Sequence, residues 1–423
     1  MTRFEIGEWL LRVMTANGLT VTPMDLGRSN DWELRRGAIR HKTGRFFEVV
    51  GVIGENIAQP MIAQSEIGTL GFFFRTAPAG LEALVQAKIE PGNVGGVQLA
   101  PSLQATASNI DRAHGGAPPP GLALFRAPNG RVVCDTLQSK QGSRFLGKSN
   151  RNLALLFEDL TYESAPHRWM PVRSVLDVLH EDFLINTDAR SVLVCTPWEL
   201  LADGHPFATV SHPITPQLAR SFSAERHTER MRALKAKLER LRDCAVSPAS
   251  CSLEELPGCQ IEPNGVVRAP SAGFVVRHIQ VSSQSREVQR WDQPIIDSTG
   301  DGRAELFAVR ISGILHFGFQ AITEPGLSRR VELGPSRMAW PGISSAAEGV
   351  PTDATLLASC RQSDEGGRFF HDVTNYQLWD LGDSNPDPTL DWLTLSEIAA
   401  LLNGDGVFTN EARTLLSLIL RYL

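Results

Sequence analysis

Short apolar runs follow one another along most of the chain, and only a few segments have a helical period. Residues 4–16 place their apolar side chains three and four positions apart, and Gly18 follows, so an amphipathic helix is predicted there. The next apolar runs are short and bounded by Gly, Pro or polar residues, which is typical of strands. They lie at residues 45–50, 70–74, 84–89, 97–99, 132–134 and 153–157. The first half of the chain is therefore expected to be mainly sheet.

Helices are predicted further along. Pro171 in a first turn predicts a helix over 171–179, and a second short helix begins near Asp188. Residues 217–243 read as one basic helix with eight Lys or Arg and four Asp or Glu. Its apolar residues follow spacings of three, four and three, which is a short heptad seam made of Met231, Leu234, Leu238 and Leu241. The seam packs either across a domain junction or against a second copy of the chain, and a homodimer is the expected assembly.

A pattern of the first half returns in the second half, 234 positions later. Glu90-Pro91-Gly92 recurs as Glu324-Pro325-Gly326, and Gln86 recurs as Gln320. Each copy contains several strands and then one or two helices; in the second copy a strand is predicted at 311–319, and Thr394 with Glu397 forms a capping box. The expected fold class is therefore α+β, with two tandem modules of mixed sheets and flanking helices. The predicted division is 1–215 for the first module, 216–245 for a linker helix and 246–423 for the second module.

The two copies differ in charge. Lys88 of the first copy becomes Ile322, Gln98 becomes Glu332, and the run from Lys148 to Asn152 has no basic counterpart in the second copy. Anionic groups such as phosphates need cations and fixed hydrogen-bond donors. The first copy is therefore predicted to have kept an anion site that the second lost.

Composition excludes several classes of protein. The net charge of −6 and a pI near 6.0 argue against a nucleic-acid binder held by phosphate contacts. The N-terminus has no signal-peptide layout, and no apolar run approaches the roughly 18 residues needed to cross a membrane. Six cysteines lie far apart without a C-x-x-C pair, so neither a zinc site nor a disulfide framework is expected. A cytoplasmic location is the simplest context.

Three long motifs resemble those of the nucleotide-diphosphate-hexose 2,3-dehydratases, which make deoxysugars for natural products. They are Q-A-K-I-E-P-G-N at 86–93, Q-L-A-P-S-L-Q-A-T-A-S-N at 98–109 and Q-S-K-Q-G-S-R-F-L-G-K-S-N-R-N at 138–152. The resemblance runs from about Phe46 to the C-terminus. It implies two tandem Nudix-like modules. No helix with clustered glutamates follows Gln98 or Glu332, so metal-dependent pyrophosphate cleavage is not expected, and no metal site is predicted.

The resemblance implies 2,3-dehydration of a 4-keto-6-deoxyhexose carried on dTDP. The C4 ketone acidifies the proton on C3, a base removes it, and the C2 hydroxyl then leaves. No redox cofactor is needed, and none is expected, because oxidation at C3 and reduction at C2 cancel. The reaction asks for a base near C3, donors at O4 and an acid near O2. Two alternatives remain open: a homologue that only binds a nucleotide sugar, and another elimination or isomerisation on a different keto-sugar nucleotide.

Site residues are predicted mainly in the first copy. The catalytic candidates are Glu66, Lys88 and His114, although His114 is equally well read as a loop histidine without a role. Predicted substrate-binding residues are Trp32, Gln64, Gln98, Thr106, Asn109, Gln138, Gln141, Lys148, Ser149, Asn150, Arg151, Asn152 and Arg190. Trp32 fits a core position as well as a stacking wall, and Arg190 recurs as Arg413, which favours a structural role. The chain departs from the family pattern at Ala107, Ile110, Lys140 and Ser149, so the substrate could differ from the usual one.

Overall fold

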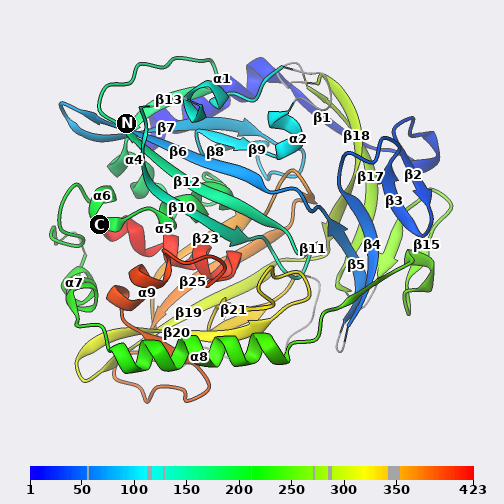
Figure 1. The fold of residues 1–423 in the computed structure, drawn as a ribbon. Coiled ribbons are helices and arrows are strands. Elements are labelled where there is room, and N and C mark those ends of the chain that lie inside the picture. The colour runs from blue at the N-terminus through cyan, green and yellow to red at the C-terminus, as the bar shows by residue number, and fades with distance from the viewer. Residues whose placement is uncertain are drawn as a thin grey trace.

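The computed structural model has a mixed α+β fold built from four sheets (Figure 1). It describes residues 1–54, 57–111, 117–126, 129–210, 212–269, 272–283, 288–341 and 353–423. Two large sheets form the body of the molecule, and two smaller sheets lie together at one side of it. No helix in the described part of the chain is long and apolar enough to cross a membrane.

The two large sheets have the same strand order. The first runs β10-β12-β6-β7-β13, and β8 and β9 pair with β7 and β6; the second runs β23-β25-β19-β20-β26, and β21 and β22 pair with β20 and β19. The first sheet comprises β6 (Gly68–Ala77), β7 (Gly80–Ile89), β8 (Val97–Ala100), β9 (Leu103–Ala105), β10 (Arg131–Ser139), β12 (Ser149–Phe157) and β13 (His167–Pro171). The second comprises β19 (Gly302–Ile311), β20 (Ile314–Thr323), β21 (Val331–Gly334), β22 (Arg337–Ala339), β23 (Thr355–Ser363), β25 (Val373–Asp380) and β26 (Asp391–Leu393). The sequence repeat is therefore a structural repeat.

The two small sheets also match, and they exchange a strand. One runs β11-β5-β4-β3-β2, the other β24-β18-β17-β16-β15. Their strands are β2 (Trp32–Arg35), β3 (Ala38–His41), β4 (Glu48–Gly54), β5 (Ile57–Ala63), β11 (Phe145–Leu146), β15 (Gln260–Ile261), β16 (Val267–Ala269), β17 (Phe274–Ser283), β18 (Arg290–Ser298) and β24 (Phe369–Phe370). The early strand β1 (Leu19–Pro23) pairs with β17 of the second copy, and β14 (Ala249–Cys251) pairs with β4 of the first. Each copy thus completes a sheet of the other.

Helices fill the space between the large sheets. Helices α5 and α10 pack on each other and on the two sheets, and their side chains are buried along their whole length. The helices are α1 (Arg3–Asn17), α2 (Ala107–Ile110), α3 (Leu122–Phe125), α4 (Val172–Asp177), α5 (Thr187–Cys195), α6 (Trp198–Leu201), α7 (Thr215–Ser223), α8 (Thr228–Cys244), α9 (Leu395–Leu401) and α10 (Asn410–Ser417), with 3₁₀ turns η1 (Leu26–Arg28), η2 (Leu253–Glu255) and η4 (Ile419–Tyr422). The predicted helices at 4–16, 171–179 and Asp188 are confirmed, with Pro171 as the N-cap of α4 instead of a residue of its first turn.

Two predicted elements are wrong in extent. The basic segment is two helices, because Ala224 is extended and His227 caps α8 by accepting the Arg230 N–H at 3.3 Å. The strand predicted at 311–319 crosses a hairpin, because Ser312 and Gly313 both have positive φ, as a tight turn between β19 and β20 requires.

The repeated Glu-Pro-Gly turn explains how the two copies hold together. The Gly92 N–H donates to the Gly366 carbonyl at 2.8 Å, and the Gly326 N–H donates to the Gly142 carbonyl at 2.9 Å. A Cβ on Gly92 or Gly326 would lie 1.6 or 1.5 Å from a backbone oxygen of the other copy. Only glycine allows this approach, so each turn is inserted into a loop of the other copy.

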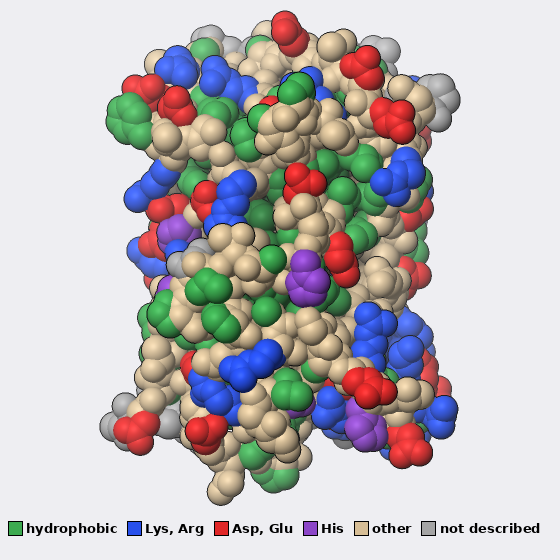
Figure 2. Space-filling view, turned by 90° about the vertical axis from the view of Figure 1, so that its left-hand side faces the viewer, with side chains coloured by type: hydrophobic (Ala, Val, Ile, Leu, Met, Phe, Trp, Pro, Cys, Tyr) green, Lys and Arg blue, Asp and Glu red, His purple; other side chains and the backbone are tan. Residues whose placement is uncertain are grey.

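The outer surface carries charges of both signs. On the face shown in Figure 2, acidic and basic side chains are interspersed between small apolar areas, and neither sign dominates. This agrees with the small net charge of −6.

Candidate active site

A pocket of about 440 Å³ lies where the first large sheet, its small sheet and the second copy meet. Its polar inner end is formed by β6, β7, β9, β12 and the start of α2. Its outer end is formed by the small sheet and by two segments of the second copy, 288–293 and 365–368. The pocket is therefore built by both copies, whereas the sequence predicted a site mainly in the first.

Glu66 is fixed at the inner end by three donors. Its carboxylate accepts the Gln64 side-chain amide at 2.7 Å, the Ser108 backbone N–H at 2.8 Å and the Ser108 hydroxyl at 3.1 Å. Ser108 lies in the first turn of α2, where backbone N–H groups have no partner within the helix. The start of this short helix thus holds the carboxylate in one orientation at the pocket.

Lys148 lies beside Glu66. Its ammonium group donates to the Glu66 backbone carbonyl. Burial lowers the pKa of Lys148 to about 8, although the Glu66 carboxylate opposes the shift. A pocket lysine with this pKa changes its charge close to neutral pH, so it can serve as a cation for an anionic ligand or exchange a proton with one.

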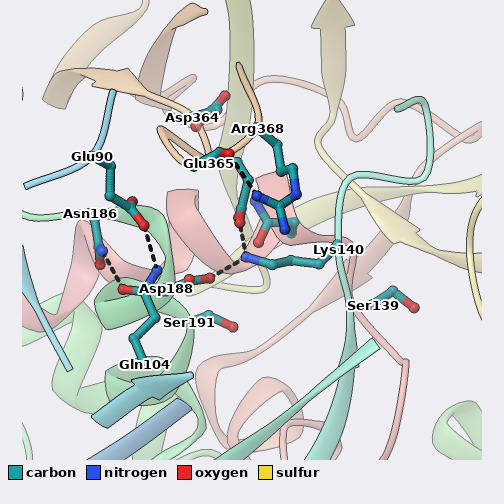
Figure 3. A network of polar contacts seen from close by, with 12 residues as sticks. Glu90, Gln104, Ser139, Lys140, Asn186, Asp188, Ser191, Asp364, Glu365 and Arg368 are labelled. Carbon is teal, nitrogen blue, oxygen red and sulfur yellow. Dashed lines mark hydrogen bonds and ion pairs between the residues drawn. The ribbon is translucent and has the colours of Figure 1, made fainter. Parts of the chain in front are cut away.

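Lys88 and Glu90 point from β7 toward the same pocket. Lys88 lies near the end of β7, Glu90 is the residue that follows the strand, and both line the pocket. The Lys88 ammonium donates to the Gln104 backbone carbonyl at 3.1 Å, and the Gln104 amide lies 3.5 Å from the Glu90 carboxylate (Figure 3). The amide of Asn186 donates to Gln104 at 2.9 Å and completes this chain of polar contacts.

Lys140 connects two acidic residues that line the pocket. Its ammonium group contacts the carboxylates of Asp188 and Glu365, which come from different copies (Figure 3). Burial disfavours the charged lysine, but the two carboxylates outweigh it and raise the pKa of Lys140. Burial, together with neighbouring Glu365 and Glu90, raises the pKa of Asp188 against the effect of Lys140. One cation thus pairs with the buried carboxylate of Asp188 and the partly buried carboxylate of Glu365.

The outer end of the pocket is aromatic and contains arginines. Trp32 is 4% exposed and donates its indole N–H to the Asp292 carbonyl at 2.8 Å. The Arg368 guanidinium lies 4.1 Å from the centre of the Phe47 ring. Other residues that line this end are His41, Arg45, Phe46, Arg290 and Trp291. Aromatic faces beside arginines suit a stacked base and a phosphate group.

Eight predicted site residues line this pocket and seven lie elsewhere. Those in the lining are Trp32, Gln64, Glu66, Lys88, Thr106, Asn109, Lys148 and Asn150. Those away from it are Gln98, Gln138, Gln141, Ser149, Arg151, Asn152 and Arg190. His114 lies outside the described residues.

Most of the residues away from the pocket have structural partners. The Arg190 guanidinium contacts Gln362 at 3.1 Å, and at the matching place Arg413 contacts Gln138 at 3.3 Å. Gln98 donates to Ser363 of the second copy at 3.0 Å. Asn152 binds Ser191 inside the first copy, and Arg151 pairs with Asp135 at the surface. These contacts join the two copies or anchor β12, so for Arg190 the structure favours the structural role.

Several pocket residues were not predicted. They are Glu90, Gln104, Lys140 and Asp188 of the first copy and Arg290, Trp291, Asp292, Glu365 and Arg368 of the second. The sequence held one signal for the residues of the second copy. Gln141–Arg144 recurs as Glu365–Arg368, and only the second copy has an acidic residue at the first of these four positions.

At the equivalent place in the second copy the charges are reversed. Asp364 stands where the first copy has Lys140, Asp372 where it has Lys148, and Ile322 where it has Lys88. Burial raises the pKa values of both aspartates. The second copy therefore has no basic side chain at these three places, and the loss of an anion site there stays a prediction. Among the described residues, no group of three or more His, Cys, Asp or Glu is arranged to hold a metal ion.

Comparison with known proteins gives a consistent result. A family model described as NDP-hexose 2,3-dehydratase matches residues 3–196 and 232–419. Three relatives carry the name dTDP-4-dehydro-6-deoxy-alpha-D-glucopyranose 2,3-dehydratase. The protein of Streptomyces violaceoruber is 31% identical over 442 residues, covering 97% of this chain and 95% of the relative. Those of Amycolatopsis orientalis and Saccharopolyspora spinosa are 30% and 29% identical, covering 98% and 97% of this chain and 89% of each relative.

Proposed function

This chain belongs to the NDP-hexose 2,3-dehydratase family, and we propose that it removes water from C2 and C3 of dTDP-4-keto-6-deoxy-D-glucose. The observation that carries the proposal is a pocket that combines fixed carboxylates and ammonium groups with an aromatic, arginine-containing end. Its volume of about 440 Å³ lies in the ordinary range for small-molecule sites. The family match over both halves places the chain among enzymes of deoxysugar biosynthesis.

The proposed reaction balances without a redox cofactor. A base takes the C3 proton, and the electron pair forms an enediolate with its charge on O4. The C2–oxygen bond then breaks, and the hydroxyl leaves as water with a proton from an acid. The resulting enol gains a proton at C2 and loses one from the C3 hydroxyl, which gives the 3,4-diketo-2,6-dideoxy sugar.

Three inner residues fit the three required roles. Glu66 is the proposed base, because Ser108 and Gln64 fix its carboxylate at the pocket wall. Lys88 is the proposed donor to O4, because a cation aimed at a developing oxyanion stabilises the transition state. Glu90, which follows β7 directly and lines the same pocket, is the proposed acid for the C2 hydroxyl.

The outer end is the proposed nucleotide site. Thymine stacks against the aromatic wall that includes Trp32 and Trp291, and the diphosphate lies near Arg45, Arg290 and Lys148. This orientation puts the neutral keto sugar next to Glu66 and Lys88.

Finer features of the protein follow from the same resemblance. Each copy is proposed to have a Nudix-like fold, the protein to be a homodimer and its location to be cytoplasmic. The supporting observations are the repeated strand order, the 39% exposed Leu241 on α8, and the absence of paired cysteines among the described residues. Leu234 and Leu238 of the same seam are buried inside this chain, so only the end of the seam is open to a second copy. Gel filtration with light scattering tests the homodimer.

Incubation of the purified protein with dTDP-4-keto-6-deoxyglucose, followed by mass spectrometry, tests the activity. The proposal requires loss of one water per sugar. Unchanged substrate, together with protection of the protein against thermal unfolding, would mean binding without catalysis.

A further inference from the structure

A second pocket of about 580 Å³ lies behind the proposed active site, between α1, β7 and the loop 164–168. The residues that matter for its chemistry are Trp9, Arg12, Gln86, Lys88, Gln104 and Arg168. Arg12 and Arg168 are exposed and mark its rim, whereas Trp9 is buried at its wall. Neither the reaction nor the nucleotide site proposed above uses this space.

The lining of the second pocket carries only one sign of charge. Arg12, Lys88 and Arg168 line it, and none of its lining residues is Asp or Glu. The active-site pocket is different, because its lining includes the carboxylates of Asp31, Glu66, Glu90, Asp188, Asp292 and Glu365. Of the two pockets, the second therefore has the lining that favours a compact, highly charged anion.

Gln86 gives a second and independent indication of a polar ligand. Its side chain lines the pocket, is only 6% exposed, and its Oε1 atom has no hydrogen-bond partner in the described part of the chain. A buried amide oxygen without a hydrogen-bond partner is unfavourable, so a ligand that donates to it would be stabilised there. A phosphate group that carries a hydroxyl can accept from the amide N–H and donate to its oxygen.

The strand edge adds further polar groups. Strand β7 pairs with β13 only as far as Gln86, while its pairing with β8 continues to Ile89. The last contact on this side of β7 is the hydrogen bond from the Ala87 N–H to the Pro166 carbonyl. Beyond Ala87, this edge of the strand lies along the second pocket. Backbone groups at such an edge are available to a ligand.

We propose that this pocket binds a small phosphate-bearing molecule at a site separate from the nucleotide-sugar site. Lys88 and Gln104 line both pockets, so the occupant touches the wall of the active site from behind. The cations at the rim hold the phosphate, and Gln86 fixes its orientation.

Isothermal titration with inorganic pyrophosphate tests the proposal, because pyrophosphate can enter both pockets. Two binding events are expected in the unaltered protein. The double variant Arg12→Ala/Arg168→Ala weakens one event at least about tenfold, since charge-assisted hydrogen bonds are lost. The variant Arg290→Ala weakens the other event, in the active-site pocket. Arg232→Ala/Arg240→Ala on α8 is the matched control, because it removes two exposed arginines remote from both pockets and changes neither event.

Gln86→Leu separates a binding role from a structural one. It removes a buried amide oxygen that has no hydrogen-bond partner in the described part of the chain, so the variant is expected to melt at a higher temperature and to bind pyrophosphate more weakly in the second pocket. Thymidine, which has no phosphate, gives no event there. A single event that Arg290→Ala abolishes and the Arg12/Arg168 variant retains would overturn the proposal, as would equal losses in the α8 control. These titrations need no catalysis, so their failure would leave the proposed dehydration untouched.

Discussion

Lys140 of the first copy and Glu365 of the second form a partly buried ion pair although 225 positions separate them in the sequence. The same ammonium group also pairs with Asp188. These two ion pairs link the junction between the copies to the lining of the proposed active site. Folding of the second copy is therefore a condition for the geometry of the first.

Lys140→Met is expected to destabilise the protein strongly. It leaves the buried Asp188 and the partly buried Glu365 without a cation, and breaking a buried pair such as Lys140–Asp188 costs roughly 3–5 kcal/mol. Urea unfolding measures the loss. The matched control is Lys237→Met, which removes a partly exposed pair with Asp391 at 2.8 Å and is expected to cost about 1 kcal/mol or less. Equal losses in the two variants would show that the Lys140 pair is not a buried junction.

Glu66→Gln and Lys88→Met are expected to lower kcat by about 10²- to 10⁴-fold, the range for loss of a positioned acid, base or oxyanion donor. Both keep the approximate size of the side chain, so far-UV circular dichroism and the melting temperature should change little. Glu163→Gln, at an exposed position away from the pocket, is the matched control. A Glu66→Gln enzyme with full activity would remove Glu66 from the role of base.

The pH dependence of kcat/KM is expected to report Lys148. Burial lowers the pKa of its ammonium group to about 8, so the group is charged below that pH and loses its charge as the pH rises through it. Binding of the diphosphate therefore weakens above about pH 8, and kcat/KM falls. Lys148→Arg keeps the charge at high pH and is expected to move this fall upward. An identical profile in both proteins would exclude Lys148 as the titrating group.

Glu332→Gln is expected to stabilise the protein at pH 8. Burial raises the pKa of Glu332 to about 7 from its ordinary value of 4.5, so the folded protein holds a proton that the unfolded chain releases. The contribution of this proton to the free energy of unfolding is fully present below about pH 4, and it is lost as the pH rises to 7. The charged form above pH 7 costs on the order of 3 kcal/mol. The first copy has Gln98 at the equivalent place, which shows that an amide fits there.

Denaturant unfolding between pH 5 and pH 8 measures this effect. Glu332→Gln is expected to flatten the fall in stability with rising pH. Gln98→Glu, the reverse change in the first copy, is the matched variant and is expected to steepen it. A Glu332→Gln protein that is less stable at pH 8 would show that the carboxylate is a net stabilising acceptor for Ser139.

Local patterns predicted the repeat but not how the copies interlock. The recurrence of Glu90-Pro91-Gly92 identified two modules, and the charge difference between Lys148 and Asp372 is the basis for the prediction that the first copy keeps an anion site. The hydrogen bond from the Gly92 N–H to the Gly366 carbonyl joins segments that are far apart in the sequence, and no local pattern encodes it. For the same reason the contributions of Glu365 and Arg368 to the pocket were missed.

Some errors have a local cause. Ser312-Gly313 lies inside an apolar stretch, and a two-residue turn there leaves the alternation of side chains nearly continuous. Arg190 shows a different difficulty: it stays a predicted substrate-binding residue with a structural role as the alternative, and its partners in the structure are Gln362, Ser417 and Cys360 of the second copy. A charged side chain in a motif predicts a polar partner, but the sequence does not say whether that partner is a ligand or the protein itself.

The central claim is that this pocket removes the C3 proton and expels the C2 hydroxyl of a keto-sugar nucleotide. The direct test is incubation with dTDP-4-keto-6-deoxyglucose in deuterated water, followed by NMR and mass spectrometry of the sugar. The account predicts loss of one water and deuterium at C2. Exchange at C3 without loss of water, or an unchanged sugar, would contradict it.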